Sequence, residues 1–225
     1  MTTLKFFSDV ERDVQLLRTF DLRSFFGEET YNYFLSLYYP ELVGKTHKEI
    51  VDFFHYNGER LIREMQQSSE QLKKDWKKCN NFFTEVERVT GFAWKHDTYY
   101  CHLSSSFICG GCYDLESETI VSVFPRVSHC NALDTLLHEL VHLHFWGVID
   151  ELELGTAEDK ENTKGTLWHL SEIAVNYPLE RIRIGFKPSL HIYKQHEEIW
   201  QHIKKYWHLN FKEFIRRSYH DMTSK

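Results

Sequence analysis

Residues 132–149 constrain the fold most, because they form the longest nearly continuous apolar stretch of the chain. Five ionisable side chains interrupt this stretch: Asp134, His138, Glu139, His142 and His144. A membrane span of this length tolerates few or no charged groups, so the stretch is not predicted to cross a bilayer. Asn131 is a favourable N-cap and Gly147 is typical of a helix stop, so we predict a helix between them. The helix is expected to be buried, which requires partners for its polar groups.

The composition indicates a mainly helical chain. It has 225 residues, of which 42% are hydrophobic, enough for a sizeable core in one large domain or in a core domain with a smaller extension. Glycine (10) and proline (4) are rarer than their usual shares of roughly 7% and 5%. Few turn-forming residues remain to separate long periodic stretches, which favours helices over a sandwich of short strands.

Local patterns divide the chain into helical and strand-forming parts. Residues 5–90 are predicted to form successive helices, and residues 59–89 follow a rough 3.6-residue period that Gly91 ends. Residues 99–113 and 119–124 are rich in aromatic and β-branched side chains and flank a polar turn, which is typical of a hairpin.

Helices follow this predicted sheet. Another helix begins near Thr166 and is expected to end near Tyr177, because Pro178 disfavours helix at the residue before it. From Leu190 the chain is again helical, with Trp200, Trp207 and Phe211 as expected core residues. The order of elements predicts an α+β fold, mostly helical, with a small sheet before the buried helix. We divide it into a helical region 1–90 and a region 91–225, within one compact unit.

Charge and cysteine content limit the classes of protein. The net charge of −6 argues against nucleic-acid binding through a broad basic face. No signal-peptide pattern is visible near Met1. The five cysteines are odd in number in a chain that is not small, so a disulfide framework is not expected. These features predict a reduced, cytoplasmic protein that binds neither nucleic acid nor membrane; they leave its oligomeric state open.

The buried helix carries a pattern with a chemical meaning. His138 and His142 are four residues apart, about 40° around the helix axis and one turn along it. Both imidazoles can therefore bind one metal ion at roughly 2.0–2.1 Å. Glu139 lies about 100° further round, where its carboxylate can reach a water on that metal. A lone histidine on an apolar helix is usually a core residue, but a metal would satisfy all three polar groups at once.

The segment His138-Glu-Leu-Val-His142 resembles the active helix of the zincin metallopeptidases. The preceding stretch, residues 107–114 and 119–124, is similar to the strands that come before that helix in the same group. The resemblance covers about residues 90–180. It implies zinc as cofactor, a peptide or protein as substrate, and an edge strand that pairs with the substrate backbone.

The third metal ligand decides the subgroup within this resemblance. The metzincin extension needs Gly and His where this chain has Phe145 and Val148, so that branch is excluded. In gluzincins the ligand is a glutamate on a later helix, which matches Glu172. Four residues on, where thermolysin-like members have an aspartate that binds a ligand imidazole, this chain has Asn176, whose carbonyl oxygen can accept the same bond.

Two other residues compete for the third ligand position. His169 precedes Glu172 by three residues on the same helix face, and Glu158 lies in a segment that faintly resembles an aspzincin element. The cysteines Cys109 and Cys112 form a CxxC pair without a second pair, so we interpret them as half-buried thiols.

The resemblance also implies a mechanism. Zinc would activate water, Glu139 would accept its proton as general base, and a tyrosine or histidine donor would share the negative charge on the carbonyl oxygen. The chain offers five donors, Tyr177, His169, His191, Tyr193 and His196, and we take Tyr177 as the catalytic one although the residues alone do not separate them. The predicted function is a zinc metallopeptidase. The alternatives are an inactive zincin-fold regulatory protein and a non-peptidase zinc hydrolase.

Overall fold

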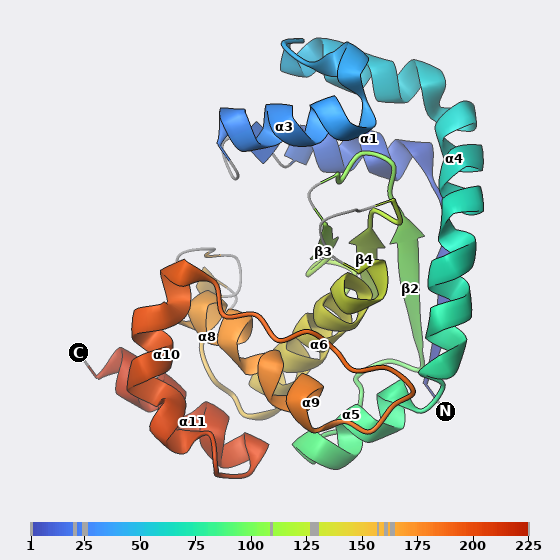
Figure 1. Cartoon of the computed structure of the whole chain (residues 1–225). Coiled ribbons are helices and arrows are strands. Elements are labelled where there is room, and N and C mark those ends of the chain that lie inside the picture. Colours follow the sequence, from blue (N-terminus) through green and yellow to red (C-terminus); the bar gives the residue numbers. More distant parts are fainter. Residues whose placement is uncertain are drawn as a thin grey trace. The chain divides into compact units, whose positions relative to one another are not determined.

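The computed structural model describes residues 2–19, 22–23, 27–108, 110–126, 131–156, 158–159, 162 and 165–224. It confirms an α+β chain that is mostly helical (Figure 1). Two compact units divide it. Unit 1 contains Met1–Thr3, Lys77–Asp97 and Leu137–Lys225; unit 2 contains Leu4–Trp76 and Thr98–Leu136. The boundary predicted near residue 90 lies inside unit 1. Among the described residues, none of the helices is both long and apolar enough to span a membrane.

Unit 2 contains nearly all of the sheet. Its strands are β1 (Thr3–Phe7), β2 (Thr98–Leu103), β3 (Gly111–Tyr113) and β4 (Ile120–Val123), in the order β1-β2-β4-β3. β4 pairs in parallel with β2 and antiparallel with β3. The predicted turn between the hairpin strands is confirmed, since Asp114 Oδ1 accepts hydrogen bonds from the amides of Glu116 and Ser117. The predicted strand 99–113 is in fact two strands, because residues 104–108 and 110, between β2 and β3, are not in strand conformation.

The prediction that residues 5–90 form only helices is wrong at its start, where β1 lies at a sheet edge beside β2. Its partner is some ninety residues away in sequence, so no local period could reveal the pairing. The remaining helices of unit 2 are α1 (Val10–Thr19), α3 (Glu28–Tyr38), the 3₁₀ turn η1 (Pro40–Leu42) and most of α4 (His47–Lys78). Buried side chains of α4 include Phe54, Leu61 and Met65.

Unit 1 is helical. It contains α5 (Phe82–Thr90), most of α6 (Ala132–Glu151), α8 (Thr166–Ala174), α9 (Asn176–Arg181), η2 (Lys194–His196), α10 (Glu197–Ile203), η3 (Lys204–Tyr206) and α11 (Phe211–Thr223). The predicted end of α5 is confirmed: Gly91 is left-handed, with φ 78°, and its amide donates to the Glu87 carbonyl at 2.8 Å. The periodic run 59–89 is not one helix, because the chain turns between α4 and α5.

Helix α6 begins where expected and ends later. Asn131 Oδ1 accepts from the Leu133 amide at 2.9 Å, which confirms the predicted N-cap. The predicted stop at Gly147 is wrong, because α6 continues to Glu151. A glycine inside a helix costs about 1 kcal/mol relative to alanine. The burial of flanking side chains such as Phe145 and Ile149, both fully buried, outweighs that cost.

The predicted helix 166–177 is two helices. The chain turns at Val175, between α8 and α9, and Pro178 lies in the first turn of α9 rather than ending a helix. This position suits proline, because amides in the first helical turn have no partner within the helix. The predicted C-terminal helices are confirmed. Phe211 is buried, while Trp200 and Trp207 are half-buried with ring centroids 4.9 Å apart.

Candidate metal centre

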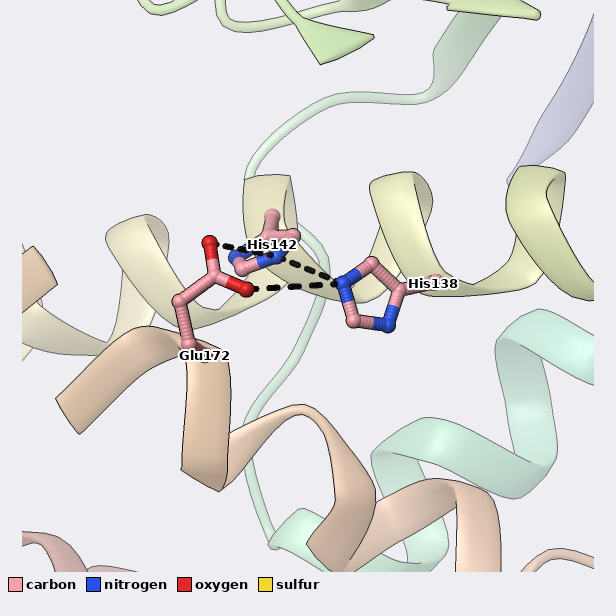
Figure 2. Close-up of side chains that lie close together, drawn as sticks. All are labelled: His138, His142 and Glu172. Carbon is pink, nitrogen blue, oxygen red and sulfur yellow. Dashed lines mark hydrogen bonds and ion pairs between the residues drawn. The ribbon is translucent and has the colours of Figure 1, made fainter. Parts of the chain in front are cut away.

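Two helices of unit 1 bring the predicted ligands together. α6 carries His138 and His142 one turn apart, and α8 carries Glu172 beside them (Figure 2). The Nε2 atoms of the two histidines lie 3.0 Å apart. The Glu172 oxygens lie 3.6 Å from His142 Nε2 and 3.9 Å from His138 Nε2. The three predicted ligands therefore lie together within one unit of the structure, unit 1.

The spacing of these atoms fits one small metal ion. A tetrahedral ion with ligand bonds of about 2.0–2.1 Å separates its ligand atoms by about 3.3–3.4 Å. The three observed separations, 3.0, 3.6 and 3.9 Å, lie on both sides of that value. Across the part of the chain that the structure describes, this is the one group of three or more histidine, cysteine, aspartate or glutamate side chains arranged to hold a metal.

Burial gives the two histidines the protonation state that a metal requires. Desolvation lowers the pKa of His138 to about 4 and that of His142 well below its ordinary value. Both imidazoles are therefore neutral near pH 7, with a nitrogen lone pair available for a metal. Burial also raises the pKa of Glu172 to about 7, because its charge lacks the hydration that would stabilise it. A cation between the three groups would favour the ionised carboxylate.

Glu139 is held close to this centre by its place on α6. Its side chain is buried, only 8% exposed, beside two ligand positions on the same helix. Burial and the negative charge of Glu172 raise its pKa well above the ordinary value. The electrostatic effect of Glu172 indicates that the two carboxylates share one environment. A raised pKa suits a group that has to take up and release a proton near neutral pH.

Asn176 has a different role from the predicted support of a ligand imidazole. Its Nδ2 donates to the carbonyl oxygen of His191 at 2.8 Å, and its Oδ1 accepts from the amide of His191 at 3.0 Å. Longer bonds of 3.3 Å run from Nδ2 to the carbonyls of Glu172 and Ile173. The Asn176 side chain thus binds the main chain of two segments, α8 and the residue His191. Its carbonyl oxygen accepts from the His191 amide and not from a ligand imidazole.

Tyr177 is placed as a core residue. Its hydroxyl donates to the carbonyl oxygen of Leu209 at 2.6 Å, so its one proton is already engaged. Its ring stacks on Phe214, with centroids 5.5 Å apart, and under the Arg181 guanidinium at 3.9 Å. These contacts correct the interpretation of Tyr177 as the catalytic donor: the hydroxyl belongs to the packing of α9 against the segment before α11.

Four further histidines of unit 1, His144, His169, His191 and His196, differ in their surroundings. His169 and His196 bind each other, with their Nδ1 atoms 3.0 Å apart, and His196 is buried. His144 is a buried core histidine, with Nε2 2.9 Å from Thr90 Oγ1. His191 is exposed, and its charge further lowers the pKa of His138. Of the proposed donors, His191 thus has an electrostatic connection to the ligand pair.

The competing ligands do not join the centre. His169 lies on α8 with Glu172 but bonds to His196, and neither it nor Glu158 belongs to the cluster of ligand atoms. Tyr193 is half exposed on the segment that also carries His191. Cys109 lies outside the described residues, and Cys112 is half-buried in β3.

A polar cluster in unit 2 was missed by the sequence analysis. Asp13 on α1 is buried, and its carboxylate accepts hydrogen bonds from the three consecutive serines 104–106, which follow β2. His102 Nε2 lies 3.9 Å from Asp13 Oδ1. Nothing in the sequence distinguishes Asp13 from neighbouring charged residues, because its partners are about ninety residues away.

We compared the chain with models of known families, with curated proteins and with solved structures, and none of the three comparisons gives a match.

Proposed function

We propose that this protein is a zinc-dependent hydrolase of the gluzincin type that cleaves peptide bonds. One observation carries the proposal: the ligand atoms of His138, His142 and Glu172 lie within 4.8 Å of one another, with a buried glutamate next to the first histidine. Neutral imidazoles and one carboxylate are a typical ligand set for a catalytic zinc, which keeps its fourth position for water or substrate.

Each residue of the centre has a proposed role. His138, His142 and Glu172 hold the metal. Glu139 accepts a proton from the attacking water and passes it to the departing amine, a step for which its raised pKa is suited. A bound Zn²⁺ would supply the Lewis acid that polarises the scissile carbonyl and lowers the pKa of water.

We assign to His191, in place of Tyr177, the role of donating a hydrogen bond to the carbonyl oxygen of the substrate. Its imidazole is exposed and influences His138, so it is both accessible to a ligand and close to the ligand pair. The hydroxyl of Tyr177 is engaged by Leu209. In this arrangement the His191 ring donates a hydrogen bond to the substrate oxygen as negative charge develops there.

The wider setting is also part of the proposal. The resemblance of the active helix to zincins favours a peptide or protein substrate over other hydrolysable bonds. The odd number of cysteines favours a reduced compartment such as the cytoplasm. The acidic composition disfavours nucleic acid as a partner.

The test begins with metal content and then measures turnover. Untagged protein is analysed by elemental mass spectrometry, and the zinc-loaded form is incubated with a library of peptides. We expect about one zinc per chain and cleavage that Glu139→Gln abolishes while its zinc content stays unchanged. That variant is a matched control, because it keeps the size of the side chain and removes only its basicity.

Other outcomes identify the alternatives. Bound zinc without cleavage of any peptide would favour an inactive regulatory protein or a hydrolase of another bond, and small ester and amide substrates would separate these two. A protein that binds no zinc when zinc is supplied would overturn the proposal, since no other observation on this chain requires an enzyme.

A further inference from the structure

An irregular segment links α9 to η2 and is joined through the Asn176 side chain to the carbonyl oxygen of Glu172. We call residues 182–193 the strap (orange in Figure 1). It has no regular secondary structure, but hydrogen bonds near both of its ends hold it to other parts of unit 1. Near its start the Arg183 amide donates to Glu85 Oε2 at 2.8 Å, and the Arg183 carbonyl accepts from Asn81 Nδ2 at 2.9 Å.

A glycine allows the strap to lie close to the end of α4. The Gly185 amide donates to the Lys78 carbonyl at 3.3 Å. A Cβ atom at Gly185 would lie 2.5 Å from that same oxygen, so any other residue would push the strap away. Contacts of its main chain thus hold the first half of the strap, and the contact at Gly185 requires a glycine.

The second half is held by Asn176. The amide of this side chain forms two hydrogen bonds with one residue, His191, at 2.8 and 3.0 Å. Two bonds to the carbonyl and the amide of a single residue fix both its position and the direction of its backbone. Asn176 itself is 3% exposed, begins α9 and lies four residues after Glu172.

The side chains on the two sides of this clamp differ in exposure. Asn176 is buried and also donates from Nδ2 to the carbonyl oxygen of Glu172 at 3.3 Å, whereas the residue that it holds, His191, is exposed. A structural clamp needs no exposed imidazole at this place. The arrangement suits a side chain that meets an incoming molecule while its backbone stays fixed.

We infer that Asn176 is the positioning residue of the centre, and that its paired hydrogen bonds to the main chain of His191 hold that imidazole beside the metal ligands for contact with substrate. The inference rests on the proposed function and deepens it. It replaces the expected support of a ligand ring with support of the proposed hydrogen-bond donor, His191. It also predicts that Asn176 affects turnover rather than metal binding.

The test uses Co²⁺ as a paramagnetic probe in place of zinc, in the full chain with labelled histidines. The His191 ring signals are assigned from the spectrum of His191→Gln. In the wild type we expect these signals to be shifted and broadened by Co²⁺. In Asn176→Ala the shift and broadening should largely disappear, while Co²⁺ still binds at one ion per chain. Lys187→Ala, an exposed change on the same strap, is the matched control and should leave the spectrum unchanged.

Turnover provides the second readout, which a merely structural role would not reproduce. Both Asn176→Ala and His191→Ala should lower kcat by about 10²-fold with little change in KM. The double variant should lose no more than His191→Ala alone, because the two residues act through one contact. Independent, multiplying losses would overturn the inference.

The remaining outcomes are also decisive. If Co²⁺ binds but leaves the His191 signals unaffected in the wild type, or equally affected in Asn176→Ala, the inference is overturned and the proposed metal centre stands. If no Co²⁺ binds to the wild type, the proposed function fails and the inference fails with it. Should Asn176→Ala not fold, Asn176→Asp decides, because it keeps the acceptor for the His191 amide and loses the donor; it should give an intermediate loss of the Co²⁺ effect.

Discussion

Two carboxylates, one in each unit, are surrounded in opposite ways: Asp13 is buried, and the side chain of Glu172 is 13% exposed. Asp13 in unit 2 is saturated: the hydroxyls of Ser104, Ser105 and Ser106 donate to it at 2.5–2.9 Å, and the Ser105 amide adds a bond at 3.0 Å. Glu172 in unit 1 faces two imidazole nitrogens at 3.6 and 3.9 Å, too far for hydrogen bonds.

The comparison separates a carboxylate whose hydrogen bonds are complete from one that we propose binds a metal. Burying a charge is costly unless the protein or a bound ion compensates it. Around Asp13 the protein supplies all the compensation, so the cluster joins α1 to the segment after β2. Around Glu172 the compensation is incomplete, and burial raises its pKa to about 7. The incomplete cluster is the one with the geometry of a metal site.

The largest expected effect on stability comes from the saturated carboxylate. Asp13→Ala leaves several buried donors without an acceptor, each at a cost of about 1–3 kcal/mol. We expect the free energy of unfolding, measured by urea titration, to fall by about 3–4 kcal/mol in total. Zinc content should be unchanged. A loss below about 1 kcal/mol would show that water replaces the carboxylate easily and would weaken the contrast.

Removing the other carboxylate should affect metal binding instead. Glu172→Ala deletes one of three ligands, so we expect zinc affinity to fall by more than about 10²-fold, the upper effect of removing a mere partner of a ligand. Competition with a chromophoric chelator measures the affinity. Glu180→Ala, a change at an exposed glutamate of the same unit, is the control. Unchanged affinity in Glu172→Ala would transfer the third ligand position to another residue.

A pH titration of the metal-free protein sharpens the contrast. The pKa of Glu172 is raised from 4.5 to about 7 in the fold, so the folded state binds a proton that the unfolded state has released in that range. The contribution of Glu172 to stability therefore falls as pH rises from about 4.5 to 7, because its carboxyl group is the stronger acid in the unfolded state. Glu172→Gln removes this loss and should stabilise the metal-free protein by about 1–2 kcal/mol at about pH 8, with little change near pH 4.

Thermal and urea unfolding in the presence of a chelator measure this difference. The corresponding change in unit 2, Asp13→Asn, should destabilise at every pH, because an amide cannot accept from all of the serine donors at once. If both amide variants destabilise the protein, the two carboxylates are equivalent and the comparison fails.

The smallest expected effect tests redundancy within the saturated cluster. Ser105→Ala removes one hydroxyl donor at 2.5 Å from Asp13 Oδ2, while the amide of the same residue still donates to that oxygen. We expect a loss of about 1 kcal/mol in the free energy of unfolding, the net value of a typical hydrogen bond. A loss as large as that of Asp13→Ala would mean that the cluster acts as a single unit.

The helices were predictable to the extent that they are local. The period of residues 59–89, the cap at Asn131 and the stop at Gly91 all depend on neighbours within one or two turns, and the two terminal signals are confirmed. The strand β1 and the end of α6 beyond Gly147 were not predictable in this way. Pairing with a distant strand and burial of flanking side chains decide them, and both override local preference.

The candidate centre also has one part that depends on local sequence and one part that depends on tertiary packing. The spacing of His138 and His142 on one helix follows from 3.6 residues per turn, so the sequence alone determined that both rings face one side. Glu172 could be chosen from a later helix by resemblance, but only the packing of α8 beside α6 brings its oxygens within 4 Å of the rings.

The role of Asn176 and the place of Tyr177 required the tertiary structure. Both were interpreted from their distance in sequence to a ligand, whereas their real partners are His191 and Leu209. A helix period determines which side chains share a face, because it is a property of one segment. Which main chain or carboxylate meets that face depends on segments that approach from elsewhere, and burial then sets their charge. The sequence by itself determined a helix with two histidines on one face. The fold decided which residues meet that face.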